Sequence, residues 1–152
     1  MIDTNDKIDK ELMNIMQSYF PLSRQPFDDI GKRLGLTEKE TISRLRKLSE
    51  KGFIRKVGAI ISARDIGFVS LLAAVSVPEE KVDKVAEIIN TYPGVTHNYL
   101  RSGNPNIWFT LIEPDQETLE KNLTEIENKV KTKVYRLPAK KIYKIGVKFD
   151  IK

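Results

Sequence analysis

The chain has 152 residues, of which 40% are hydrophobic and 31% are charged, and its formal net charge is +5. This composition is typical of a folded globular protein, and we find no apolar run near the roughly 18 residues that span a bilayer. With an acidic N-terminus in place of a signal peptide, the chain is expected to be cytoplasmic and without membrane contact. It has no cysteine and one histidine, which excludes disulfides, thiolate catalysis, iron–sulfur clusters and multi-histidine metal centres within one chain. The positive charge favours a polyanionic partner, either a nucleic acid or a polycarboxylate.

Three short helices are predicted in the first 52 residues. Apolar residues at helical spacing from Ile8 to Tyr19 indicate the first helix, which ends before a proline. Pro26 suits the first turn of a second helix, and Thr37 opens a third through a capping box. An extended ribbon over 53–61 follows, so the predicted domain is a winged helix-turn-helix over residues 1–62.

A change of composition after Gly67 marks a second predicted domain, residues 63–152. Its elements alternate between apolar or period-2 segments and amphipathic helical stripes. In chain order the sequence predicts a strand at 68–77, a helix after Pro78, strands around His97 and at 107–112, a helix at 119–130, and extended pieces at 134–137 and 142–149. The order βαββαβ is the ferredoxin-like arrangement, so the predicted fold class is α+β, with one sheet face free to bind a ligand or partner.

The strand around the single histidine carries an unusual group of side chains. If residues 96–101 are extended, His97, Tyr99 and Arg101 project to one face, because successive side chains alternate across a strand. That face would present an imidazole, a phenol and a guanidinium. The pattern favours a site for an anionic aromatic ligand over a hydrocarbon core.

A helix-turn-helix followed by a ferredoxin-like domain resembles the leucine-responsive, or Lrp/AsnC, family of regulators along almost the whole chain. Those proteins are dimers that bind DNA and sense amino acids. Residues 37–51, which would form the recognition helix, hold five basic and three acidic residues, a net charge of only +2. This is low for a helix that reads DNA, since affinity for DNA depends on cations placed against phosphates.

Several motifs point to one branch of that family. They are Tyr19–Phe27 between the first two helices, 52–59, Gly94–Tyr99, Asn106–Thr110 and Leu137–Lys144. In this order they resemble siroheme decarboxylase subunits of haem and haem d1 biosynthesis. The resemblance implies loss of carbon dioxide from two acetate side chains of siroheme, giving 12,18-didecarboxysiroheme. It also implies a homologous second subunit in an alpha-beta heterodimer, and we expect the chain alone to form a homodimer through its sheet domain.

The resemblance assigns hypothetical roles to individual residues. His97 would be a proton donor or a contact to the siroheme iron, Tyr99 a proton relay, and Arg101 a holder of the leaving acetate. Aromatic rings would cover the macrocycle, and the candidates are Trp108, Phe109 and Tyr143. Cations would bind its carboxylates, and the candidates are Arg55, Arg136, Lys140, Lys141 and Lys144. Siroheme is then the substrate, no separate cofactor is implied, and haem as a regulatory ligand stays an open alternative.

Two other functions remain open from the residues. One is a transcription regulator that reads DNA with residues 41–47 and binds an effector in the sheet domain. The bulky insertion at 20–26, with its two prolines, disfavours this interpretation, and we expect no nucleic-acid partner. The other is a sensor that binds a tetrapyrrole without reacting. Whether the chain is an alpha or a beta subunit, and whether its own pocket is catalytic, also stays open.

Overall fold

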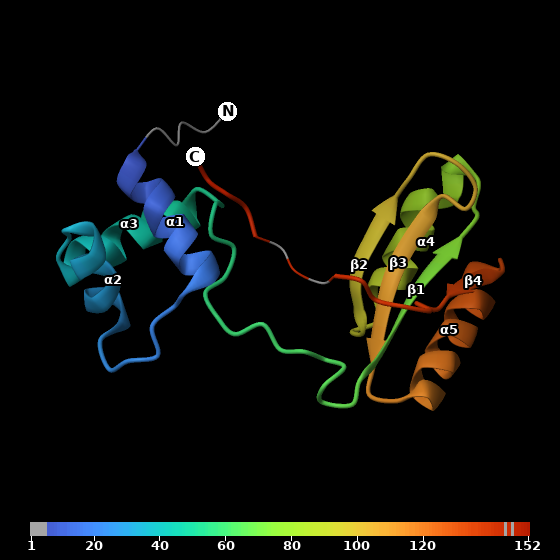
Figure 1. Cartoon of the computed structure of the whole chain (residues 1–152). Helices are drawn as coiled ribbons and strands as arrows, with labels where there is room; N and C mark the ends of the chain where they lie inside the picture. Colours follow the sequence, from blue (N-terminus) through green and yellow to red (C-terminus); the bar gives the residue numbers. More distant parts are fainter. Residues whose placement is uncertain (1–5, 145, 147) are drawn as a thin grey trace. The chain divides into compact units, whose positions relative to one another are not determined.

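A computed structural model describes residues 6–144, 146 and 148–152, which form two compact units (Figure 1). Unit 1 comprises Met1–Ile60 together with Lys144–Lys152, and unit 2 comprises Ile61–Tyr143. The sequence-based prediction divides the chain between residues 62 and 63, and the two compact units meet between Ile60 and Ile61. Lys144–Lys152, which the sequence-based prediction includes in the second domain, are grouped with the helices of unit 1.

Unit 1 is a bundle of α1 (Lys7–Ser18), α2 (Pro26–Leu34) and α3 (Glu38–Glu50). The predicted capping box is present: the Thr37 hydroxyl accepts from the Glu40 amide, and the Glu40 carboxylate accepts from the Thr37 amide at 2.8 Å. The helices bury a common apolar core made of Leu12, Met13, Ile30, Leu45 and Leu48. Helix ends and core therefore follow the sequence pattern closely.

The segment predicted as an extended ribbon after α3 has no regular secondary structure. The structure assigns no strand to any residue from 53 to 61. Gly52 ends α3 in a left-handed conformation with φ 78°, and the Phe53 amide then donates to the Leu48 carbonyl at 2.9 Å. Phe53 and Ile54 pack against the unit 1 core, so burial of these apolar side chains determines their conformation in place of ladder hydrogen bonds.

Unit 2 has the predicted ferredoxin-like order. Its elements are β1 (Val69–Val75), a short 3₁₀ turn η1 (Glu79–Lys81), α4 (Val82–Asn90), β2 (Val95–Leu100), β3 (Ile107–Glu113), α5 (Gln116–Val130) and β4 (Val134–Leu137). The strands pair antiparallel in the order β2-β3-β1-β4. The extended piece predicted over 142–149 is no strand in its described residues, and residues 145 and 147 lie outside the described part.

The two faces of this sheet have different surroundings. Helices α4 and α5 cover one face (Figure 1), and β3 contributes Ile107, Phe109 and Leu111 to the core beneath them. The other face is open within the unit and carries apolar and aromatic side chains from all four strands: Leu72, Ala74, Tyr99, Trp108, Ile112, Tyr135 and Leu137. Among the described residues, no helix has the length and apolar character needed to cross a membrane.

Candidate functional site

A β-bulge sets the direction of the histidine side chain. Strand β2 pairs Val95 with Leu111 but His97 with Thr110, so one extra residue, Thr96, is inserted between them. Val95 packs on the core, and without the bulge His97 would point to the same face, because residues two apart share a face. The extra residue turns His97 to the open face and keeps Val95 in the core.

The side chains predicted to share a face do meet there. A surface hollow of about 450 Å³ is lined by Leu72, His97, Tyr99, Arg101, Trp108 and Thr110. The His97 and Tyr99 rings have centroids 6.0 Å apart with an interplanar angle of 32°. The Arg101 guanidinium carbon lies 5.9 Å from the centre of the Tyr99 ring. Imidazole, phenol and guanidinium therefore form one continuous row along the hollow.

Local hydrogen bonds hold two of these side chains. The Trp108 indole N–H donates to the Pro105 carbonyl at 2.9 Å, which fixes the indole across the floor of the hollow. His97 Nδ1 lies 3.1 Å from the Thr96 hydroxyl, an interaction that occupies one ring nitrogen and leaves Nε2 for a ligand. The bulge residue thus also orients the histidine that it turns outward.

The hollow has the electrostatics of an anion site. Its lining residues include a guanidinium and an imidazole, and none of them is acidic. Arg101, Tyr99 and His97 are exposed, so their polar groups can reach a ligand. In the described residues, no three histidine, aspartate or glutamate side chains gather as they would around a metal ion. The arrangement can hold a carboxylate at Arg101, stack a planar ring against Trp108, and exchange a proton at His97.

Phe109 corrects the sequence-based prediction. This side chain has no exposed surface and belongs to the core under the helices. Trp108 precedes it on β3 and faces the hollow, so the two aromatic neighbours lie on opposite faces of the sheet. Phe109 therefore stabilises the fold and does not line the hollow.

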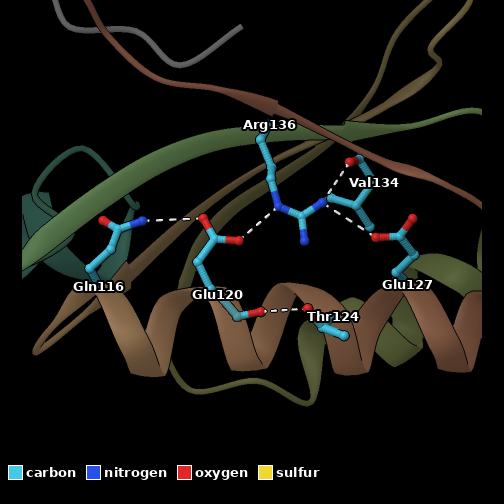
Figure 2. A network of polar contacts seen from close by, with 6 residues as sticks. All are labelled: Gln116, Glu120, Thr124, Glu127, Val134 and Arg136. Atoms are coloured by element: carbon cyan, nitrogen blue, oxygen red, sulfur yellow. Dashed lines mark hydrogen bonds and ion pairs between the residues drawn. The ribbon is translucent and has the colours of Figure 1, made fainter.

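Arg136 is also on the other face. It stands opposite Ala73 of β1 on the helix-covered side, where its Nε donates to Glu120 at 2.9 Å and its Nη1 to Glu127 at 3.3 Å (Figure 2). Partial burial acts to lower the pKa of Arg136, but the bonds to the two carboxylates outweigh burial and raise the pKa. Arg136 joins β4 to α5 and is not brought to the hollow.

The other predicted cations lie outside the hollow. Lys140 and Lys141 are exposed on the segment that follows β4, with the Lys141 ammonium 4.9 Å from the centre of the Tyr143 ring. Arg55 and Lys144 belong to unit 1, so the geometry of the hollow is described without them.

Two lining residues were not among the predicted ones, namely Leu72 and Thr110. Thr110 stands opposite His97 and could have been found from alternation with Trp108 along β3. Leu72 lies in a nearly continuous apolar run, in which both faces look alike, and only its pairing with Thr110 places it on the open face.

The helix-turn-helix presents fewer free cations than its sequence suggests. Arg44 of α3 donates to Asp6 at 2.6 Å and to Asp9 at 2.7 Å, and these bonds raise its pKa while Arg44 lowers the pKa of Asp6. Helix α2 shows the same tendency: Arg33 lies over the Tyr19 ring and Lys32 pairs with Asp28. Guanidinium groups engaged within the unit are less available to phosphates.

Comparison with known proteins places these features in a family. Residues 65–144 match the family model described as an AsnC-like ligand binding domain, and residues 9–55 match the siroheme decarboxylase NirDL-like HTH domain. The siroheme decarboxylase alpha subunit of Desulfovibrio desulfuricans is 44% identical over 95% of this chain and 83% of its own length. The siroheme decarboxylase NirD subunit of Pseudomonas aeruginosa is 34% identical over 96% of this chain and 97% of its own length.

Solved structures similar to this chain include both a siroheme decarboxylase and an AsnC family regulator. The siroheme decarboxylase NirDL, crystallised with an iron-uroporphyrin III analogue, is 32% identical and superimposes with a TM-score of 0.72 over 88% of this chain, which spans 44% of the NirDL chain. An AsnC family transcriptional regulator from Agrobacterium tumefaciens has a TM-score of 0.76 at 19% identity, a likeness of fold alone. By sequence along nearly its whole length, the chain belongs to the siroheme decarboxylase family, a branch of the AsnC-like proteins.

Proposed function

We propose that this chain is a siroheme decarboxylase subunit that removes carbon dioxide from two acetate side chains of siroheme, giving 12,18-didecarboxysiroheme. The observation that carries the proposal is the hollow on the open sheet face, where His97, Tyr99, Arg101 and Trp108 meet. Siroheme is a large planar ring with a fringe of carboxylates. A flat indole floor beside a cation and a proton donor suits such a molecule. Siroheme is the substrate, and no separate cofactor enters the proposal.

The reaction has two parts, cleavage of a carbon–carbon bond and protonation of the carbon that remains. The bond between the acetate methylene and its carboxylate breaks, carbon dioxide leaves, and the electron pair stays on the methylene, delocalised into the tetrapyrrole. A proton must then reach that carbon to give a methyl group. His97 donates this proton or contacts the iron of the substrate, and Tyr99, 6.0 Å away between ring centroids, relays a proton to it.

Arg101 orients the acetate that leaves. A guanidinium can bind a carboxylate through two parallel hydrogen bonds, which fixes the carboxylate plane relative to the ring. The same pair must dissociate as carbon dioxide forms, so a single exposed cation suits the reaction better than a closed cluster, which would stabilise the bound substrate more than the transition state.

The hollow of one chain covers one face of a tetrapyrrole. Its remaining carboxylates need further cations, which we assign to Lys140 and Lys141 beyond β4 and to a second subunit. The exposed apolar side chains of the open face, Leu72, Tyr99, Tyr135 and Leu137, support pairing through this face with a homologous subunit or a second copy. Haem as a regulatory ligand of the same hollow is part of this proposal.

The test is anaerobic incubation of the purified chain with siroheme, with and without its homologous partner, followed by mass analysis of the tetrapyrrole. We expect two successive losses of carbon dioxide, slowed roughly 10²–10⁴-fold by His97→Ala. Unchanged turnover of His97→Ala would remove His97 from the reaction.

The assay also distinguishes the alternatives. A shifted visible spectrum without product, even with the partner present, would indicate a tetrapyrrole sensor. No spectral change, together with a salt-dependent shift of DNA, would support the regulator. The engagement of Arg44 by Asp6 and Asp9 leads us to expect no DNA shift.

A further inference from the structure

The end of the chain is bound to the first helix by paired hydrogen bonds. Asn14 Nδ2 donates to the Ile151 carbonyl at 3.0 Å, and the Ile151 amide donates back to Asn14 Oδ1 at 3.3 Å. Gln17 makes the same pair with Phe149: Nε2 donates to the carbonyl at 3.1 Å, and the amide donates to Oε1 at 2.8 Å. Each side-chain amide thus satisfies both backbone groups of one tail residue.

The spacing of these pairs matches an extended peptide on a helix. Residues two apart in the tail face α1, as alternate residues of a strand do, while the exposed Asp150 lies between them. Residues three apart on a helix are separated by about 4.5 Å of rise and residues two apart on a strand by about 6.6 Å. Gln17 has one methylene more than Asn14, which lets its amide reach across this difference.

A side-chain contact adds to the backbone pairs. Ile151 packs against the apolar core of unit 1, which includes Leu12 and Met13 of α1. The two side-chain amides bind only backbone groups of the tail, so these hydrogen bonds do not depend on the tail's side chains. The contact with the core, in contrast, requires an apolar side chain at the position of Ile151. Together they form a binding site for a short extended peptide that has an apolar residue at the position of Ile151.

The tail belongs to the helical unit although it follows the sheet domain in the chain. The chain leaves unit 1 after Ile60 and returns to it at Lys144. The hydrogen bonds of Asn14 and Gln17 to the tail are therefore contacts within unit 1.

We propose that the surface of α1 formed by Asn14 and Gln17 is a peptide-docking site whose ligand is the chain's own C-terminal tail, residues 149–151. In this protein the helix-turn-helix unit binds that tail through the side-chain amides of Asn14 and Gln17 and the apolar contact of Ile151. The proposal is independent of the decarboxylase reaction, because it concerns contacts within unit 1.

Hydrogen exchange of the full-length chain tests the docking. The amides of Phe149 and Ile151 should exchange at least about tenfold more slowly than in an unstructured peptide, and the Asp150 amide at the unstructured rate. The double variant Asn14→Ala/Gln17→Ala should lose this alternating protection while the amides of α3 stay protected. Gln116→Ala, which removes an exposed amide of α5, serves as the matched control and should leave the tail unchanged.

A peptide experiment tests the site itself. In a variant that ends at Lys148, an acetylated peptide of residues 148–152 should shift the side-chain amide signals of Asn14 and Gln17, and the same peptide with Ile151→Asp should bind at least tenfold more weakly. Rapid exchange at Phe149 and Ile151 in the wild type would overturn the proposal, as would protection that depends on protein concentration, which would indicate a tail supplied by another copy. Absence of peptide-induced shifts, with α1 still protected, would equally contradict it.

Discussion

The two faces of the unit 2 sheet are built from the same strands but have different roles: one forms the core, and the other carries the hollow. On β3, Phe109 is fully buried beneath the helices, and Trp108 lies in the hollow on the opposite side. Two arginines at the edges of the sheet divide in the same way. Arg136 of β4 is paired with carboxylates on the helix-covered face, whereas Arg101, which directly follows β2, lines the hollow. Residue type alone therefore does not distinguish a stabilising side chain from one that binds a ligand.

The two faces differ in whether the guanidinium group of their arginine already has carboxylate partners within the protein. Arg136 has two carboxylates and the Val134 carbonyl as partners (Figure 2). Arg101 contacts the Tyr99 ring and lines a hollow without acidic residues. An arginine with bound carboxylates has little to offer a substrate carboxylate, and one without them is ready to bind.

The largest effect on stability is expected on the helix-covered face. Phe109→Ala removes a fully buried ring and leaves a cavity, so the free energy of unfolding should fall by about 3–5 kcal/mol, measured by chemical denaturation. Trp108→Ala, its neighbour on the open face, should cost less stability and impair tetrapyrrole binding. If both variants lost the same stability, the two faces would not differ as described.

Arg101→Leu should slow the reaction and leave the stability of the fold almost unchanged. Loss of the guanidinium should slow decarboxylation by roughly 10²-fold, since a charge-assisted bidentate bond to the leaving acetate disappears. Stability should stay within about 0.5 kcal/mol of the wild type, because the residue is exposed. Arg101→Lys keeps the charge and should recover part of the rate; a normal rate for Arg101→Leu would contradict its role.

Arg136→Leu should lower stability and spare the reaction. Its ion pairs are about one-third exposed, so after allowance for solvent screening we expect a loss of about 1–2 kcal/mol in the free energy of unfolding. The affinity for siroheme should remain that of the wild type, measured by spectral titration. A selective loss of siroheme binding with normal stability would return Arg136 to the site that its residue type first suggested.

Local signals predicted the fold well. The capping box at Thr37 and the start of α2 at Pro26 both lie where the sequence places them, because they depend on neighbours within a few residues. The grouping of His97, Tyr99 and Arg101 was likewise predictable, since alternation along a strand is a local property.

The sequence-based predictions were wrong where contacts between residues far apart in the sequence determine the conformation. Alternation indicates that Trp108 and Phe109 face opposite ways, but only the pairing of β3 with its neighbours and the position of the helices determine which of them is buried. The segment ending at Phe149 has the pattern of a strand, yet Phe149 pairs with the side-chain amide of Gln17 in α1, more than 130 residues away in sequence. The bulge at Thr96 has no sequence signature here, because nothing local distinguishes an inserted residue from a paired one.

The smallest expected effect concerns that bulge. Thr96→Val keeps the shape of the side chain but removes the hydroxyl that lies 3.1 Å from His97 Nδ1. One hydrogen bond of this kind contributes about 0.5–1.5 kcal/mol, so kcat should fall by roughly two- to tenfold through a less well oriented imidazole, while the free energy of unfolding stays nearly constant. Thr96→Ser restores the hydroxyl and should restore kcat. If Thr96→Ser were as slow as Thr96→Val, the bulge would orient His97 through backbone geometry alone, and the hydroxyl would have no part in the difference between the two faces.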